Sequence, residues 1–120
     1  MKIFSLAIMA VSLSTSIFAQ SQPAKPQLSS LVLDNKTVKV TAFEGQPGKD
    51  MCGLGKHSHG AHLTVMLTEA TVTVTLPDGK VVTQKMPAGT TFWSEAETHT
   101  VINGGKSLAK AQIIEYKKKK

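Results

Sequence analysis

The chain carries the stretch His57-Ser58-His59-Gly60-Ala61-His62, which holds three of its four histidines. The fourth, His99, follows a second strand-rich segment. Neutral imidazole is the commonest metal ligand among protein side chains, and a β-strand places residues i and i+2 on one face. We therefore expect His57 and His59 to point the same way and to bind a metal ion as a pair.

The segments around this stretch have the composition of short β-strands. Residues 71–76 alternate Val and Thr with a period of two, and Pro77-Asp78-Gly79-Lys80 has the composition of a hairpin turn. No part of the mature chain shows helical periodicity, and short strands separated by turns predict an all-β sandwich or barrel. The other strands are expected at 30–33, 37–43, 63–68, 81–86, 90–93, 99–103 and 107–116, with loops at 44–55 and 94–98.

The first nineteen residues resemble a secretory signal peptide. Lys2 provides a positive start, an apolar run follows, and Ile17-Phe18-Ala19 has the composition of a cleavage site. The run is too short and too rich in hydroxyls for a membrane span, so we expect no stable membrane insertion and a periplasmic or secreted protein. The expected organisation is a signal peptide at 1–19, a flexible leader at 20–28, one barrel domain at 29–116 and a lysine tail at 117–120.

The basic charge of the chain is concentrated at its ends. The formal net charge is +6, and it falls to +1 without Lys2 and the terminal Lys117–Lys120. Nucleic-acid binding needs a basic face with arginines and aromatic side chains, and this chain has no arginine. We expect no nucleic-acid partner, and a tail that is solvated or contacts an anionic surface.

Cys52 is the only cysteine, so no disulfide can form within the chain. In an exported protein a single cysteine is a pairing partner, a reactive thiol or a metal ligand, and it is equally a small buried hydrophobic residue. Together with Met51 and Met66 it offers soft sulfur donors, which suit copper.

Two motifs in this chain resemble those of small single-domain cupins of the cupin_2 type. In the first motif, Gly53 or Gly55 precedes His57-Ser58-His59. In the second, Gly89 leads to His99-Thr100-Val101-Ile102-Asn103, which keeps the His-x3-Asn ending. The resemblance covers residues 37–116 and implies an all-β, double-stranded β-helix or jelly-roll barrel.

The chain departs from the cupin pattern at several positions. Ser94 and Ala96 stand where the second motif usually has proline and glycine, and the usual glutamate of the first motif is absent. Aligned from the strand that follows, the glutamate position falls on His62. The resemblance then implies a divalent transition metal held by His57, His59, His62 and His99.

The orientation of His62 depends on Gly60. On an unbroken strand, His62 would point away from His57 and His59, together with Thr64 and Met66. A bulge or turn near Gly60 would shift the phase and bring His62 into the site. Both orientations are compatible with the sequence, and the match of the following strand favours the bulge.

An all-imidazole site suits Zn, Cu, Fe or Ni better than Mg or Ca. Four histidines closing a tetrahedron indicate a structural or storage site, whereas three histidines leave a position for Lewis-acid or dioxygen chemistry. Trp93 is expected to pack in the core or a pocket wall, and Asn103 to be a turn residue. The candidate neighbours of the site are Cys52, Met66, Trp93 and Asn103.

Two functional classes fit these features. One is a non-enzymatic barrel that binds or senses a metal or small-molecule ligand. The other is a metal-dependent dioxygenase or related oxidoreductase acting on a small anionic or thiol-bearing substrate. A vestigial structural or interaction domain is a third, which the four retained histidines disfavour. Glu95 and Glu97 are the only carboxylates near His99 in the sequence, and we expect both to be solvated.

A homodimer is expected if His62 faces inward. In that phase Leu63, Val65 and Leu67 point out of the barrel, and a row of exposed apolar side chains is usually covered by another subunit.

Overall fold

The computed structural model describes residues 28–118, and every regular element in that range is a β-strand. The expected signal peptide, nearly all of the leader and the last two lysines lie outside the described residues. In the described range, no helix long and apolar enough to cross a membrane is found. The strands are β1 (Ser29–Asp34), β2 (Val38–Gly45), β3 (His57–His59), β4 (His62–Met66), β5 (Ala70–Thr75), β6 (Val81–Met86), β7 (Thr91–Ser94), β8 (Glu97–Asn103) and β9 (Ala109–Tyr116).

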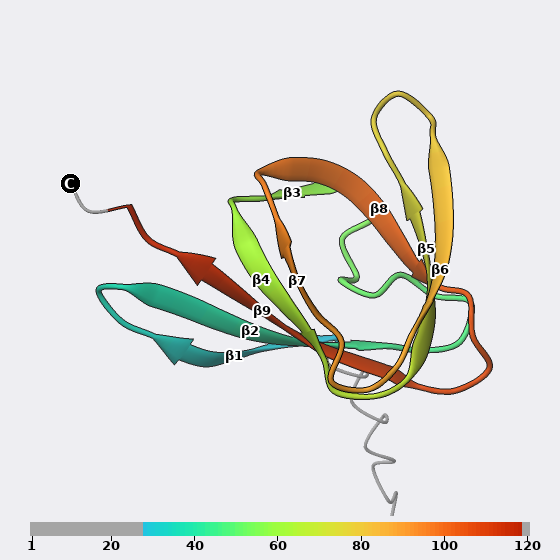
Figure 1. The fold of residues 1–120 in the computed structure, drawn as a ribbon, viewed down its shortest axis with the longest axis horizontal. Helices are drawn as coiled ribbons and strands as arrows, with labels where there is room; N and C mark the ends of the chain where they lie inside the picture. The colour runs from blue at the N-terminus through green and yellow to red at the C-terminus, as the bar shows by residue number, and fades with distance from the viewer. Residues whose placement is uncertain (1–27, 119–120) are drawn as a thin grey trace, which may run out of the picture.

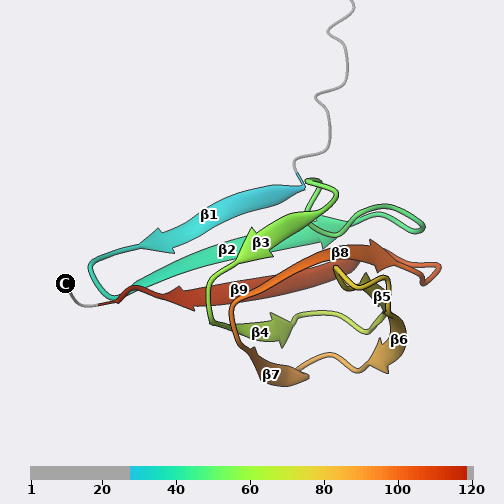
Figure 2. The same cartoon turned by 90° about the horizontal axis from the view of Figure 1, so that it is seen from above.

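The strands form two antiparallel sheets. One has five strands in the order β1-β2-β9-β4-β7, and the other has four in the order β3-β8-β5-β6. In Figure 1, β4 and β7 lie across the molecule from β5 and β6, and Figure 2 shows the same separation from above. The inner faces of the two sheets therefore enclose a common interior.

The chain changes sheet between β3 and β4. Only Gly60 and Ala61 separate the two strands, yet β3 pairs with β8 whereas β4 pairs with β7 and β9. Because β4 belongs to another sheet, its alternation of inward and outward residues is independent of the alternation along β3. His62 is buried as a result, and only 2% of its surface is exposed.

The core is made of small and flexible side chains. Ala109 and Ala111 of β9 are buried and contribute little volume, so they leave space inside the barrel. Met51, Met66 and Met86 are also buried, and methionine fills irregular space with little strain. These side chains therefore line the interior of the barrel without filling it completely.

Two expected loops are shorter than the sequence indicated. β2 continues to Gly45, because it pairs with β9 along all eight of its residues. β8 begins at Glu97, because Glu97 and Thr98 pair with His59 and Ser58 of β3. In both places pairing with a distant strand overrides weak local strand propensity.

Asn103 is fully buried and fixes the turn after β8. Its Nδ2 donates hydrogen bonds to the carbonyls of Gly45 and Ser107, each at 2.8 Å, and its Oδ1 accepts one from the amide of Gly105 at 2.9 Å. The side chain is therefore occupied by backbone groups, as a turn residue would be.

The Asn103→Ala variant should be strongly destabilised. The substitution leaves the buried carbonyl of Gly45 without its donor, so we expect a loss of about 3 kcal/mol in unfolding free energy, measured by urea denaturation. Asn35→Ala is the matched control, because Asn35 makes similar backbone hydrogen bonds at an exposed turn and should lose less than about 1 kcal/mol. Equal losses in the two variants would contradict this role for Asn103.

Candidate metal centre

The four histidines converge from three strands. His57 and His59 come from β3, His62 from the start of β4, and His99 from β8, where it is paired directly with His57. The ring centre of His59 lies 4.7 Å from that of His57, 5.1 Å from that of His62 and 5.5 Å from that of His99. The fold thus places the rings of the other three implied ligands within 5.5 Å of the ring of His59.

Backbone carbonyls set the tautomers of two of these rings. Nδ1 of His57 donates a hydrogen bond to the carbonyl of Gly55, and Nδ1 of His62 donates one to the carbonyl of Gly60, each at 2.7 Å. A carbonyl oxygen only accepts, so the hydrogen lies on Nδ1 in both rings. In the neutral rings Nε2 then carries the lone pair that a metal requires.

Carboxylates lie beside the other two rings. Oε1 of Glu97 is 3.3 Å from Nδ1 of His99, and Oε1 of Glu115 is 3.6 Å from Nδ1 of His59. A carboxylate beside one ring nitrogen favours the hydrogen there and raises the basicity of the other nitrogen. All four rings therefore have an oxygen near Nδ1, as metal-binding histidines commonly do.

The Nε2 atoms provide the test of whether a metal fits. Nε2 of His57 and Nε2 of His59 are 2.9 Å apart. Nε2 of His99 is buried and has no hydrogen-bond partner among the described residues. The two lone pairs of His57 and His59 at this distance would be stabilised by a cation, and a buried nitrogen without a partner, as in His99, is otherwise unfavourable. The donor set therefore fits a transition metal.

Burial keeps two of the imidazoles neutral. The pKa of His59 is lowered to about 4, first because burial disfavours the charged ring and then because His57, His62 and His99 repel it. The pKa of His99 is also lowered, mainly by burial, with Glu97 acting in the opposite direction. Both rings are therefore neutral at pH 7, which is the form that binds metals.

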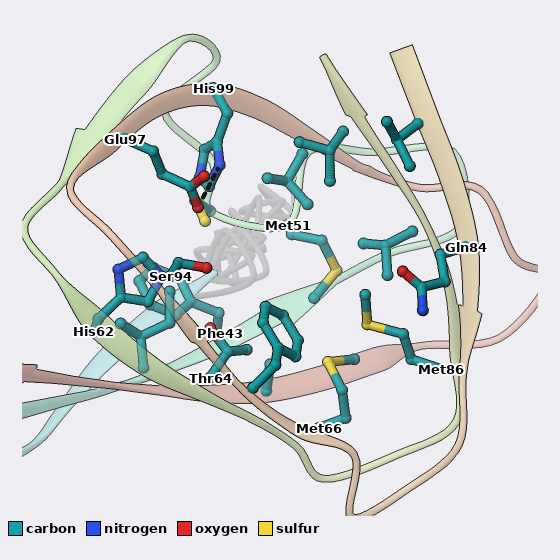
Figure 3. A pocket seen from close by; sticks show the side chains of 18 residues that line it. Phe43, Met51, His62, Thr64, Met66, Gln84, Met86, Ser94, Glu97 and His99 are labelled. Carbon is teal, nitrogen blue, oxygen red and sulfur yellow. Dashed lines mark ion pairs between the residues drawn. The ribbon is translucent and has the colours of Figure 1, made fainter. Parts of the chain in front are cut away.

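A cavity of about 280 Å³ extends from His62 and His99 into the barrel. Figure 3 shows His62, Ser94, Glu97 and His99 on one side of it and Met51, Met86 and Gln84 on the other. Most of the remaining wall is apolar, from Phe43, Met66, Val72, Val74, Phe92, Val101 and Ile113. The cavity thus has one polar end, at the histidines, and a long apolar part.

Known proteins match this chain in structure but not in sequence. No family model and no curated protein matches it. A cupin domain protein from Bordetella pertussis is 28% identical, over 75% of this chain and 92% of its own, with a TM-score of 0.68. An RmlC-like cupin from Methanocaldococcus jannaschii, with a double-stranded β-helix fold, is 13% identical over 80% of this chain and 84% of its own, with a TM-score of 0.61. This chain has the cupin fold.

The cupin fold confirms the fold class expected from the sequence. The two motif segments lie on β3 and β8 of this cupin barrel, paired side by side. The polyketide cyclase RemF from Streptomyces resistomycificus also matches, at 18% identity over 73% of this chain, with a TM-score of 0.57. This chain spans 63% of the matched RemF chain, and at that identity the likeness concerns the fold alone.

The sequence interpretation missed the positions of Glu97 and Glu115 beside the histidines. Glu97 was expected in a solvated loop, but it begins β8 and lines the cavity. Glu97 lies two residues before His99, and residues at this spacing on a strand share a face. This spacing would have indicated that Glu97 lies beside His99. Glu115 gave no local signal, because only the pairing of β9 with β4 brings it opposite His62. Glu95 instead accepts a hydrogen bond from Nε1 of Trp93 at 2.8 Å.

Two of the four candidate neighbours, Met66 and Cys52, line the cavity. Met66 is 3% exposed and lines the cavity. Cys52 is buried, and its Sγ and one ring nitrogen each of His57 and His59 lie within 4.8 Å of one another. Burial, with a smaller contribution from the charge of Asp50, raises the pKa of the thiol to about 12. Without a metal, Cys52 is therefore protonated at neutral pH.

The other two candidate neighbours, Trp93 and Asn103, do not line the cavity. Phe92 and Ser94 line it, so Trp93, between them on β7, points to the outside and is 50% exposed. Asn103 is buried at the far end of β8 from the histidines, where it binds backbone groups.

The metal-free protein should lose stability as the pH falls. The pKa of His59 is about 4 in the folded chain against 6.5 as its ordinary value. Between these pH values the unfolded chain takes up a proton that the folded chain does not, so the unfolding temperature should fall from about pH 6.5 to about pH 4. Calorimetry after chelation measures this slope, and His59→Gln should reduce it. An unchanged slope in His59→Gln would contradict the assignment.

Proposed function

We propose that this protein is an exported cupin that binds a divalent transition metal through His57, His59, His62 and His99, as a non-enzymatic metal- or ligand-binding protein. The observation that carries the proposal is the arrangement of the imidazoles. Each Nδ1 lies beside an oxygen acceptor, the Nε2 atoms of His57 and His59 are 2.9 Å apart, and Nε2 of His99 is buried without a partner.

The chemistry of the donors favours Zn, Cu, Fe or Ni. Imidazole nitrogen binds these metals well, whereas Mg and Ca prefer oxygen. When bound, the metal supplies a positive centre that attracts an anionic or electron-rich group. The carboxylates of Glu97 and Glu115 lie beside Nδ1 of His99 and of His59. In these positions they would orient the two rings and raise the basicity of Nε2.

A second function, a metal-dependent dioxygenase or related oxidoreductase, is favoured by the cavity. Its volume of about 280 Å³ adjoins His62 and His99, so a small substrate fits beside the proposed site. An anionic or thiol-bearing group of that substrate would meet the polar end, while the apolar part of the cavity would hold its body. The identity of the bound metal separates the two functions, because iron favours the oxidoreductase and copper or zinc favours binding.

We also propose a homodimer, supported by a row of apolar side chains across the five-stranded sheet. Residues paired directly on neighbouring strands share a face, and Leu63 on β4 has the opposite phase to buried His62. The row therefore lies on the outer face, where a second copy would cover it. Its members, each paired with the next, are Leu33, Val40, Ile114, Leu63 and Trp93.

The metal is tested by elemental analysis of untagged protein purified after export. We expect about one metal ion per chain, and none in the double variant His57→Ala/His59→Ala, because it lacks two adjacent donors. Lys56→Ala is the control, since this exposed residue precedes the pair and should leave the metal content unchanged. Absence of metal from the unaltered protein after supplementation would refute the proposed site.

The dimer is tested by light scattering. Ile114→Lys places a charge in the middle of the apolar row and should convert the dimer into a monomer. Val81→Lys is the control, because Val81 is 58% exposed on β6 of the other sheet and should leave the dimer intact. A monomeric unaltered protein, or a dimer that persists in Ile114→Lys, would show that this face is not the interface.

A further inference from the structure

The loop between β2 and β3 is bound along β8, the strand that carries His99. The amide of Met51 donates to the carbonyl of Val101 at 2.8 Å, and the amide of Asn103 donates to the carbonyl of Lys49 at 2.9 Å. The amide of Gly48 adds a bond to the carbonyl of Asn103 at 2.7 Å. This part of the loop therefore has a fixed position relative to the histidines.

Cys52 is held in place by the turn that follows. Oδ1 of Asp50 accepts hydrogen bonds from the amides of Cys52 and Gly53, each at 2.7 Å. Gly53 has a φ of +70°, and a Cβ there would overlap the side chain of Leu28, so the turn requires glycine. The backbone of Cys52 is therefore constrained on both sides.

This constraint places a sulfur atom among the histidine nitrogens. Sγ of Cys52, one ring nitrogen of His57 and one of His59 all lie within 4.8 Å of one another. The ring of His99 is 4.9 Å from that of His57, between ring centres, and its Nε2 is a buried nitrogen with no partner in the described chain. Oδ2 of Asp50 is likewise buried without one. A cation bound between this sulfur and the two ring nitrogens would also lie beside the ring of His99.

We propose that Cys52 is itself a ligand of the metal, so that the site has mixed nitrogen and sulfur donors. This inference rests on the proposed metal-binding function. On binding, the S–H bond of Cys52 breaks, its proton passes to solvent and a bond forms between Sγ and the metal, whose oxidation state does not change. The thiolate donor favours copper or zinc over iron or nickel, and it removes one unit of positive charge from the centre.

Cobalt(II) tests this coordination without any assay of activity. Co²⁺ is titrated into metal-free, untagged protein while the visible and near-ultraviolet spectra are recorded. A thiolate bound to Co²⁺ gives an intense charge-transfer band in the near ultraviolet, which nitrogen and oxygen ligands do not give. Because Cys52 is the only cysteine in the chain, this band in the unaltered protein would identify the residue even if a variant fails to fold.

We expect the band to rise until about one equivalent of Co²⁺ is bound and to be lost in Cys52→Ser. Met51→Leu is the matched control, since it removes the neighbouring sulfur and should keep the band. Cobalt bound with visible bands but no charge-transfer band would overturn the role of Cys52 and leave the histidine site standing. A complete failure to bind cobalt would count against both the histidine site and this inference.

Discussion

The site depends on the register between β3 and β8, which sets His57 directly opposite His99. β3 has only three residues, so few backbone bonds hold it, and the hydroxyls of Ser58 and Thr98 add a hydrogen bond of 2.7 Å on the outer side. A shift of one residue in either strand would turn its histidine to the opposite face of the sheet. The position of the imidazoles is therefore controlled by a short stretch of strand pairing.

Gathering four imidazoles in a buried place opposes folding when they become charged. Burial and mutual repulsion lower the pKa of His59 and of His99. In moderately acidic solution the unfolded chain therefore binds protons that the folded chain does not, and the folded state loses stability. The same features favour a metal, because neutral nitrogens whose Nδ1 atoms are already partnered lose little on coordination. The same arrangement that would suit a metal ion therefore makes the metal-free chain less stable in acid.

The sequence indicated most strands well, because Val and Thr alternate with a period of two in segments such as 71–76. It indicated His57 and His59 because His-x-His is a short local pattern, and it added His99 through the second motif of the cupin resemblance. It did not indicate the role of Glu115, since this residue approaches His59 only through the pairing of β9 with β4. It misplaced Trp93, whose direction depends on the phase of β7.

By itself, the sequence determined the all-β class, the pairing of His57 with His59 on one strand face and the presence of a single cysteine, because composition and short-range periodicity are local properties; the larger set of four histidines came from the resemblance to cupin motifs. The tertiary structure decided which of these residues meet. It turned His62 inward by moving the chain to another sheet after β3, and it brought Cys52 among the histidines by binding its loop to β8. Both results come from hydrogen bonds between segments far apart in the chain.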